Sequence, residues 1–281
     1  MTASATEPAP RRTARRRVGP VRQALRLTRT EFVLFYRYRM ALYVALLPVA
    51  FLLPAFAAEG AELWPGVDAV AYSLAGAFPL AAMTVGIVHV SNVYAARREE
   101  MVLKRFRLSG VAPAALFGAT TLSVLGVVAV QSVLAAVLIA AMFGTLPADP
   151  VLLVLSIVLV TVVMAQLGAV LSRLARNAES AQMISMIPFF GLLMSSGLYL
   201  PAEMLPDAAA AALRLLPMAP AVELARGAYF GRDVFGGADG AAAPGLDLWF
   251  AAAPALLTLL AWTAAAILLL RLVRWDPRQA R

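Results

Sequence analysis

The sequence predicts an all-α integral membrane protein with six transmembrane helices. Hydrophobic residues make up 62% of its 281 residues and charged residues only 14%, whereas a soluble domain carries about 25% charged residues. The mean hydropathy is +0.80, and the apolar residues are gathered in long uncharged runs. About 20 such residues cross the hydrocarbon core of a bilayer as a helix. A transmembrane β-barrel would instead show short alternating segments, which this sequence does not contain.

Six uncharged runs are the expected spans, and an even number of spans places both termini on the same side of the membrane. Lys and Arg residues are concentrated before the first span, after the second, after the fourth and after the sixth. Only Arg214, Arg226 and Arg232, of 24 in total, lie in the segments of the other side. The positive-inside rule therefore predicts that both termini are cytoplasmic. The expected spans are residues 40–58, 69–93, 114–142, 151–172, 181–200 and 248–270, within a membrane domain of residues 38–274.

Two basic segments precede the first span. Residues 1–17 are rich in Pro, Ala and Arg, which predicts a disordered tail attracted to the anionic inner leaflet; nucleic-acid binding is the less favoured alternative. Residues 18–37 repeat apolar side chains at helical spacing between arginines, which predicts an amphipathic helix in the membrane interface. A cleaved signal peptide is disfavoured, because its basic region would be 39 residues long. Residues 275–281 are expected to be a short cytoplasmic tail.

The content of titratable and sulfur-containing residues excludes several kinds of site. The chain has no cysteine and a single histidine, His89, which excludes thiolate and histidine-cluster metal sites. The expected spans contain no Asp, Glu, Lys or Arg, which argues against a proton- or ion-coupled transporter. We expect His89 to make a structural hydrogen bond. The many alanines and the single lysine, Lys104, are typical of a GC-rich bacterial genome, so the expected location is the bacterial plasma membrane.

The most charged segment between two expected spans is residues 95–109, which contains seven charged residues. It consists of good helix formers and has no Gly or Pro before Gly110, which predicts one continuous amphipathic helix on the cytoplasmic side. Glu100 and Lys104 have the spacing of an i,i+4 ion pair. One interpretation is a surface that a cytoplasmic partner recognises. The alternative is a solvated turn whose arginines fix the topology.

This segment carries a resemblance to a known family. Residues 98–107 read R-E-E-M-V-L-K-R-F-R and resemble the Arg-Glu-x-Gly-Thr-Leu-x-Arg-Leu-Arg pattern of ABC-2-type transporter permeases, which include bacterial daunorubicin and multidrug resistance exporters. Met101 and Val102 stand where that family usually has Gly and Thr. The resemblance implies a coupling helix that docks into a groove of an ATPase subunit. Its implied residues are Arg98, Glu99, Glu100 and Arg107 for polar contacts and Met101, Leu103 and Phe106 for apolar contacts.

Two stretches on the outer side resemble the same family. Residues 196–206 match its Ser-Gly-x-x-x-Pro-x-x-x-x-Pro run, and residues 216–227 resemble its Asn-Pro-Leu-Thr…Arg-Gly tail. The resemblance implies re-entrant helices within residues 201–247 that cap a translocation path. Proline positions predict helices at 208–216 and 221–229, separated at Pro217 and Pro220, and a flexible Gly-rich segment at 231–245. The implied outer-gate residues are Pro201, Glu203, Pro206, Pro220, Glu223 and Arg226; solvated surface charges are the alternative for Glu203 and Asp207.

Two polar side chains lie deep in expected spans. Gln131 belongs to the third span and Gln166 to the fourth. Each can line a substrate path or form a hydrogen bond between helices, and we favour packing.

The resemblance as a whole implies the permease subunit of an ATP-driven exporter. The chain has no Gly-x-x-x-x-Gly-Lys-Ser/Thr motif, so it is expected to bind no cofactor, and ATP and Mg²⁺ would be bound by a separate ABC ATPase present in two copies. A second permease chain would complete a homodimer or a heterodimer among the membrane lipids. The cargo would be hydrophobic or amphiphilic, with a drug or antibiotic first and a lipid or lipid-linked glycan next. The alternative of another class is a membrane scaffold or membrane enzyme without an ATPase.

Overall fold

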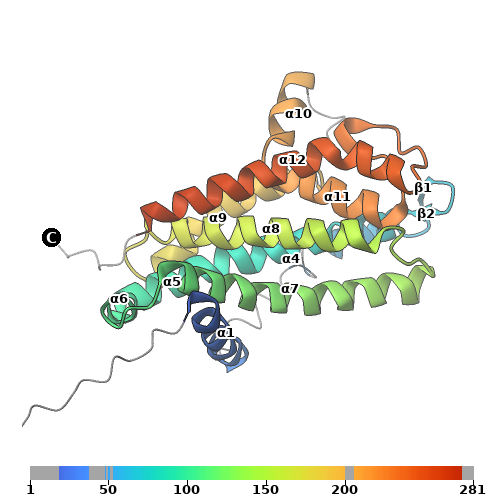
Figure 1. Cartoon of the computed structure of the whole chain (residues 1–281). Coiled ribbons are helices and arrows are strands. Elements are labelled where there is room, and N and C mark those ends of the chain that lie inside the picture. Colours follow the sequence, from blue (N-terminus) through green and yellow to red (C-terminus); the bar gives the residue numbers. More distant parts are fainter. Residues whose placement is uncertain (1–18, 38–47, 49, 51–52, 200–205, 274–281) are drawn as a thin grey trace, which may run out of the picture.

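The computed structural model describes residues 19–37, 48, 50, 53–199 and 206–273. Over these residues the chain is a bundle of helices with one small β-hairpin (Figure 1). The predicted tails, most of the first expected span, and the gate residues Pro201 and Glu203 lie outside the described residues.

The central helical segment runs from Ala69 to Glu99. Asp68 caps its first turn, because its carboxylate accepts hydrogen bonds from the backbone N–H groups of Val70 at 2.7 Å and Ala71 at 3.2 Å. Within its most apolar stretch, 89% of the residues are buried inside the chain, so neighbouring helices surround it. The segment comprises α3 (Ala69–Ala75), α4 (Ala77–Met83), the π-helical turn η2 (Thr84–His89) and α5 (Val90–Glu99). It follows η1 (Leu53–Ala58) and the antiparallel strands β1 (Glu62–Trp64) and β2 (Val67–Asp68).

Three further long helices pack around this segment. They are α7 (Pro113–Phe143), α8 (Pro150–Leu171) and α12 (Leu246–Leu269), the last continued by η5 (Leu270–Leu272). Only 28% of the apolar stretch of α7 and 17% of that of α12 are buried inside the chain. Both helices expose many large aliphatic side chains. Exposure of so much apolar surface to water is unfavourable, so we expect these faces to contact lipid.

Four described helices are long and apolar enough to cross a membrane, or five if one bent pair counts as a span. The bent pair is α10 (Asp207–Arg214) and α11 (Met218–Phe230), which meet at 80°. The apolar helix α9 (Ala178–Met194) has 17 residues and is about 26 Å long, shorter than the span predicted at 181–200. The described residues thus form a multi-span helical domain, and the six-span topology remains a prediction.

Helix α8 approaches the central segment most closely at a pair of glycines. A Cβ atom on Gly86, in η2, would lie 2.6 Å from the Cβ of Met164. A Cβ atom on Gly168, in α8, would collide with the carbonyl oxygen of Gly86. Small residues allow two helix backbones to touch in this way where lipid provides no hydrophobic driving force.

The amphipathic helix expected at residues 18–37 is present as α1 (Pro20–Arg37). It packs against α7, and the side-chain oxygen of Gln23 accepts a hydrogen bond from the backbone N–H of Ala112 at 3.3 Å. Helices α1 and α6 (Val102–Leu108) lie at one end of the bundle, and the β1–β2 hairpin lies at the other (Figure 1). We call these the α6 end and the hairpin end. Arg22, Arg26 and Arg29 of α1 are exposed.

Candidate functional site

The charged segment at the α6 end is two helices rather than one. Helix α5 ends at Glu99, and α6 begins at Val102. Met101 between them has φ 62° and ψ 12°, a left-handed conformation that L side chains disfavour. The prediction of one continuous helix over residues 95–109 is therefore wrong. The helix breaks at a methionine, and helix propensity alone does not reveal a left-handed residue. The family pattern did hold a signal, since glycine is usual at this position and adopts this conformation freely.

The two parts of this segment differ in exposure. Leu103 is 1% exposed and belongs to the main hydrophobic core, and Phe106 packs against that core. Both residues therefore attach α6 to the permease, and Met101, 39% exposed, is the most exposed of the three predicted apolar contacts. The exposed charged residues are Glu99, Glu100, Lys104, Arg105 and Arg107.

The predicted ion pair between Glu100 and Lys104 does not form among the described residues. An i,i+4 pair requires a continuous helix, and the left-handed Met101 lies between the two side chains. Lys104 thus remains an exposed positive charge on α6.

Arg98 lies inside the chain and not on its surface. Its side chain is 1% exposed and donates hydrogen bonds to the carbonyl oxygens of Ser172 at 2.9 Å and Ala175 at 2.6 Å. These carbonyls follow the end of α8. The structure therefore places Arg98 away from the surface that we expected it to present to an ATPase.

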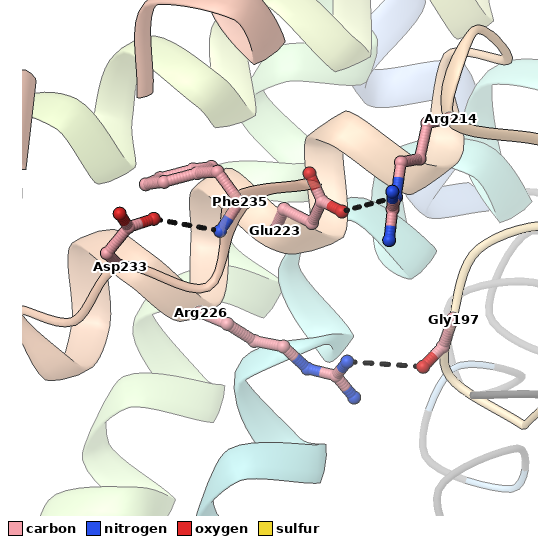
Figure 2. A network of polar contacts seen from close by, with 6 residues as sticks. All are labelled: Gly197, Arg214, Glu223, Arg226, Asp233 and Phe235. Atoms are coloured by element: carbon pink, nitrogen blue, oxygen red, sulfur yellow. Dashed lines mark hydrogen bonds and ion pairs between the residues drawn. The ribbon is translucent and has the colours of Figure 1, made fainter. Parts of the chain in front are cut away.

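A second polar group surrounds α11 near the bend of the helix pair (Figure 2). Arg226 is 8% exposed, and its guanidinium donates to the carbonyl oxygens of Tyr72 and Gly197, both at 3.2 Å. The guanidinium carbon also lies 4.2 Å from the centre of the Tyr72 ring, a cation–π contact. Arg226 thus ties α11 to α3 and to the turn that follows α9.

Glu223, one turn before Arg226, faces the other helix of the bent pair. Its carboxylate lies 3.8 Å from Nε of Arg214 in α10. Figure 2 shows this ion pair on the side of α11 away from the contact between Arg226 and Gly197. Because both side chains are partly exposed, we expect the pair to stabilise the bend only weakly.

The two prolines predicted to separate the helix pair have different positions. The pair breaks at residues 215–217, so the predicted break at Pro217 is confirmed, whereas Pro220 lies in the first turn of α11 and the predicted separation there is wrong. A proline in the first helical turn displaces no backbone hydrogen bond, which explains its place. Pro206 precedes the first residue of α10. The Nε1 of Trp262, from α12, donates to the carbonyl oxygen of Leu215 at 2.7 Å and holds the bend.

The Gly-rich segment 231–245, expected to be flexible, is held in place by many hydrogen bonds. Backbone bonds join Gly231 to Ala243 and Asp233 to Ala241, both at 2.9 Å. Arg232 donates to the carbonyl oxygens of Gly240 at 2.9 Å and Pro65 at 3.0 Å. The segment contains the short turn η4 (Phe235–Gly237). Sequence reasoning missed this arginine because one of its partners, Pro65, lies in the β1–β2 turn, 167 residues away in the chain.

Packing is the role predicted for Gln131 and Gln166. Nε2 of Gln166 donates to Oγ1 of Thr121 at 2.6 Å, which joins α8 to α7, and its side chain is buried. This contact agrees with packing. Gln131 lies half-buried on α7. Among the described residues, no group of three or more acidic or histidine side chains could hold a metal ion.

Comparison with protein families gives one match. Residues 66–272 match the family described as ABC-2 family transporter protein. This range extends from the β1–β2 turn to the end of η5 and includes both polar groups described above. No curated protein matches the chain. Since the matched range covers well over half of the sequence, the chain belongs to the ABC-2 transporter family and is a permease that spans the membrane several times.

Proposed function

We propose that this permease exports its cargo with energy from a separate ABC ATPase that docks on α6. The observation that carries the proposal is the form of α6: Leu103 fixes one side of the helix in the permease core, while Lys104, Arg105 and Arg107 face outward. A short charged helix fixed to a membrane domain can transmit a push from a soluble subunit. Membership of the ABC-2 family supports the same assignment.

The energy source follows from what the sequence lacks. Without a P-loop motif, the chain has no phosphate-binding loop of the kind that hydrolyses ATP. ATP and Mg²⁺ would therefore be bound by the partner. We propose two ATPase subunits and a second permease chain, identical or related. Closure of the ATPases would move α6, rock the helices, and switch access from the cytoplasmic to the outer side.

The cargo is proposed to be hydrophobic or amphiphilic, with a drug or antibiotic favoured over a lipid or lipid-linked glycan. An apolar pocket of about 340 Å³ supports this choice. It lies where the bend between α10 and α11 faces α8, α9 and α12. Its lining includes Leu167, Gly191, Pro217 and Trp262. A pocket lined in this way has no charged group to bind an ionic cargo.

Charge reversal on α6 tests the docking proposal. We expect Lys104→Glu with Arg105→Glu to reduce the amount of P-loop ATPase that co-purifies with the tagged permease by roughly tenfold or more, because like charges across an interface cost several kcal/mol. The measurement is quantitative mass spectrometry of the complex in mild detergent.

The matched control is Arg22→Glu with Arg26→Glu, which reverses two exposed arginines on α1. It should leave the recovered ATPase unchanged. Equal recovery from the α6 variant and the parent, or no P-loop ATPase with the parent protein, would contradict the proposal.

A further inference from the structure

The last two turns of α5 hold the turn that joins α8 to α9. Arg98 reaches from α5 to this turn and binds the carbonyl oxygens of Ser172 and Ala175 at 2.9 and 2.6 Å. At 1% exposure it is the largest fully buried side chain among the described residues. The contact joins positions 74 and 77 residues apart in the chain.

The contact joins one guanidinium to two backbone carbonyls just beyond a helix end. Helix α8 ends at Leu171, Ser172 is its C-cap residue, and its carbonyl also accepts a hydrogen bond from the backbone N–H of Ala175 at 3.2 Å, which closes the turn. The planar guanidinium of Arg98 binds both carbonyls of this turn at once with its fork of donors. A buried arginine is costly without such partners, so the fork and the two carbonyls depend on each other.

The same helix also binds the start of α9, through a residue of its first turn and its last residue. Nδ2 of Asn92 donates to the carbonyl oxygen of Ala178 at 2.9 Å. The carboxylate of Glu99 accepts from the backbone N–H of Ala178 at 3.4 Å. Between these polar contacts, Ala95, Ala175 and Ala181 form a small buried cluster. Helix α5 therefore contacts the end of α8, the turn and the first residues of α9.

Helix α6 is attached to the same body. Leu103 is buried in the main core and Phe106 packs against it. Because only the turn at Glu100 and Met101 separates α6 from Arg98, displacement of α6 acts on α5 within a few residues of the arginine.

We infer that Arg98 is a positioning residue that makes α6, α5 and the turn between α8 and α9 move as one unit. The inference rests on the proposed docking of the ATPase on α6. Through the Arg98 fork, one docking helix pulls on three membrane helices and not only on the one that precedes it. Arg98 itself touches neither the ATPase nor the cargo.

A distance measurement tests this inference. The chain has no cysteine, so spin labels at Leu108→Cys, at the end of α6, and Glu179→Cys, in the first turn of α9, are the only labels; both positions are exposed. Pulsed electron paramagnetic resonance is recorded on the purified complex without nucleotide and with ATP and orthovanadate. In the parent we expect one narrow distance, the same in both states. Arg98→Ala should lose the single narrow distance and give different distributions in the two states.

Two further variants separate positioning from other roles. Arg98→Lys keeps the charge but can bind only one carbonyl well, so it should give an intermediate width and also serves if Arg98→Ala does not fold. Arg176→Ala removes an exposed arginine from the turn between α8 and α9 and should leave the distance unchanged. Full rescue by Arg98→Lys would show that charge alone matters and would overturn the inference.

The remaining outcomes are also decisive. An unchanged distribution in Arg98→Ala overturns the inference, as does a parent distance that changes with nucleotide. Loss of co-purified ATPase in Arg98→Ala with an unchanged distance would make Arg98 a docking residue, which overturns the inference and leaves the proposed function intact. If the parent binds no P-loop ATPase, the proposed function fails. A broader distance distribution in the nucleotide-free Arg98→Ala permease would still show that Arg98 holds α5 and α6 to the turn between α8 and α9.

Discussion

Among single residues, Met101 has the backbone conformation least suited to its side chain. Its φ of 62° is positive, and it is the one described non-glycine residue with a positive φ. The left-handed conformation costs an L residue roughly 1–2 kcal/mol. The turn directly precedes α6, whose Leu103 belongs to the main core.

The Met101→Gly variant should therefore be more stable than the parent by about 1 kcal/mol, since glycine adopts positive φ without strain. Thermal unfolding of the purified permease in detergent measures the effect. Met101→Ala is the control, because alanine removes the side chain and keeps the strain. An equal rise in the unfolding temperature for both variants would place the effect in the side chain and contradict the explanation.

Arg226 is a residue whose charge is used for structure. Its guanidinium binds two carbonyl oxygens and the face of Tyr72 at once. A lysine ammonium cannot reproduce this planar arrangement. A lysine at this position would therefore weaken the contacts of α11 with α3 and with the turn after α9.

We therefore expect Arg226→Lys to destabilise the permease by about 2 kcal/mol, the scale of a lost hydrogen bond to a charged group together with a cation–π contact. Thermal unfolding reports the change. Arg214→Lys is the comparison, because the Arg214–Glu223 pair is long, at 3.8 Å, and partly exposed. A larger effect at Arg214 than at Arg226 would show that the ion pair, not the buried fork, holds the bent helices.

At the level of elements, α9 and the bend between α10 and α11 enclose the apolar pocket. Gly191 faces it from α9, and a Cβ there would meet no atom within 4 Å. The open space around this Cβ position leaves room for a larger side chain beside the pocket. This makes Gly191 a place where cargo binding can be altered without changing the fold.

Gly191→Leu should abolish most of the protection that the exporter gives to cells. The assay compares a strain without the gene, complemented by each variant, on a panel of hydrophobic and amphiphilic antibiotics. Gly118→Leu is the matched control, because Gly118 also has open space around it but lies on α7, away from the pocket. Normal protection by Gly191→Leu would separate the pocket from the transport path, and no protection by the parent would favour a lipid cargo over a drug.

The sequence predicts the positions of the membrane helices but not the contacts between them. Uncharged runs mark membrane helices directly. The spans predicted at residues 69–93 and 151–172 therefore correspond to the helical segments Ala69–Glu99 and Pro150–Leu171. Hydropathy does not record which helix touches which. The fork of Arg98, the contact between Gly86 and Gly168, and the ordered 231–245 segment all join residues far apart in the chain. The break at Met101 was not predicted, because helix propensity does not detect a left-handed residue.

At the scale of the whole molecule, the two ends of the bundle differ in their exposed charges and contacts. The α6 end has exposed basic residues on α1 and α6. At the hairpin end, Arg232 binds the carbonyl oxygens of Gly240 and of Pro65 in the β1–β2 turn. A central segment that is mostly buried inside the chain connects the two ends. This arrangement agrees with the proposal that an ATPase acts at the α6 end and that access changes at the opposite end.

Site-specific photo-cross-linking tests this division of roles most directly. A benzophenone amino acid is placed at Arg107, on α6, or at Leu146, which is 73% exposed between α7 and α8, and cells are irradiated. The account predicts a cross-link to a P-loop ATPase from position 107 and none from position 146. A cross-link to the ATPase from position 146, or from neither position, would contradict the claim that α6 receives the ATP-driven movement.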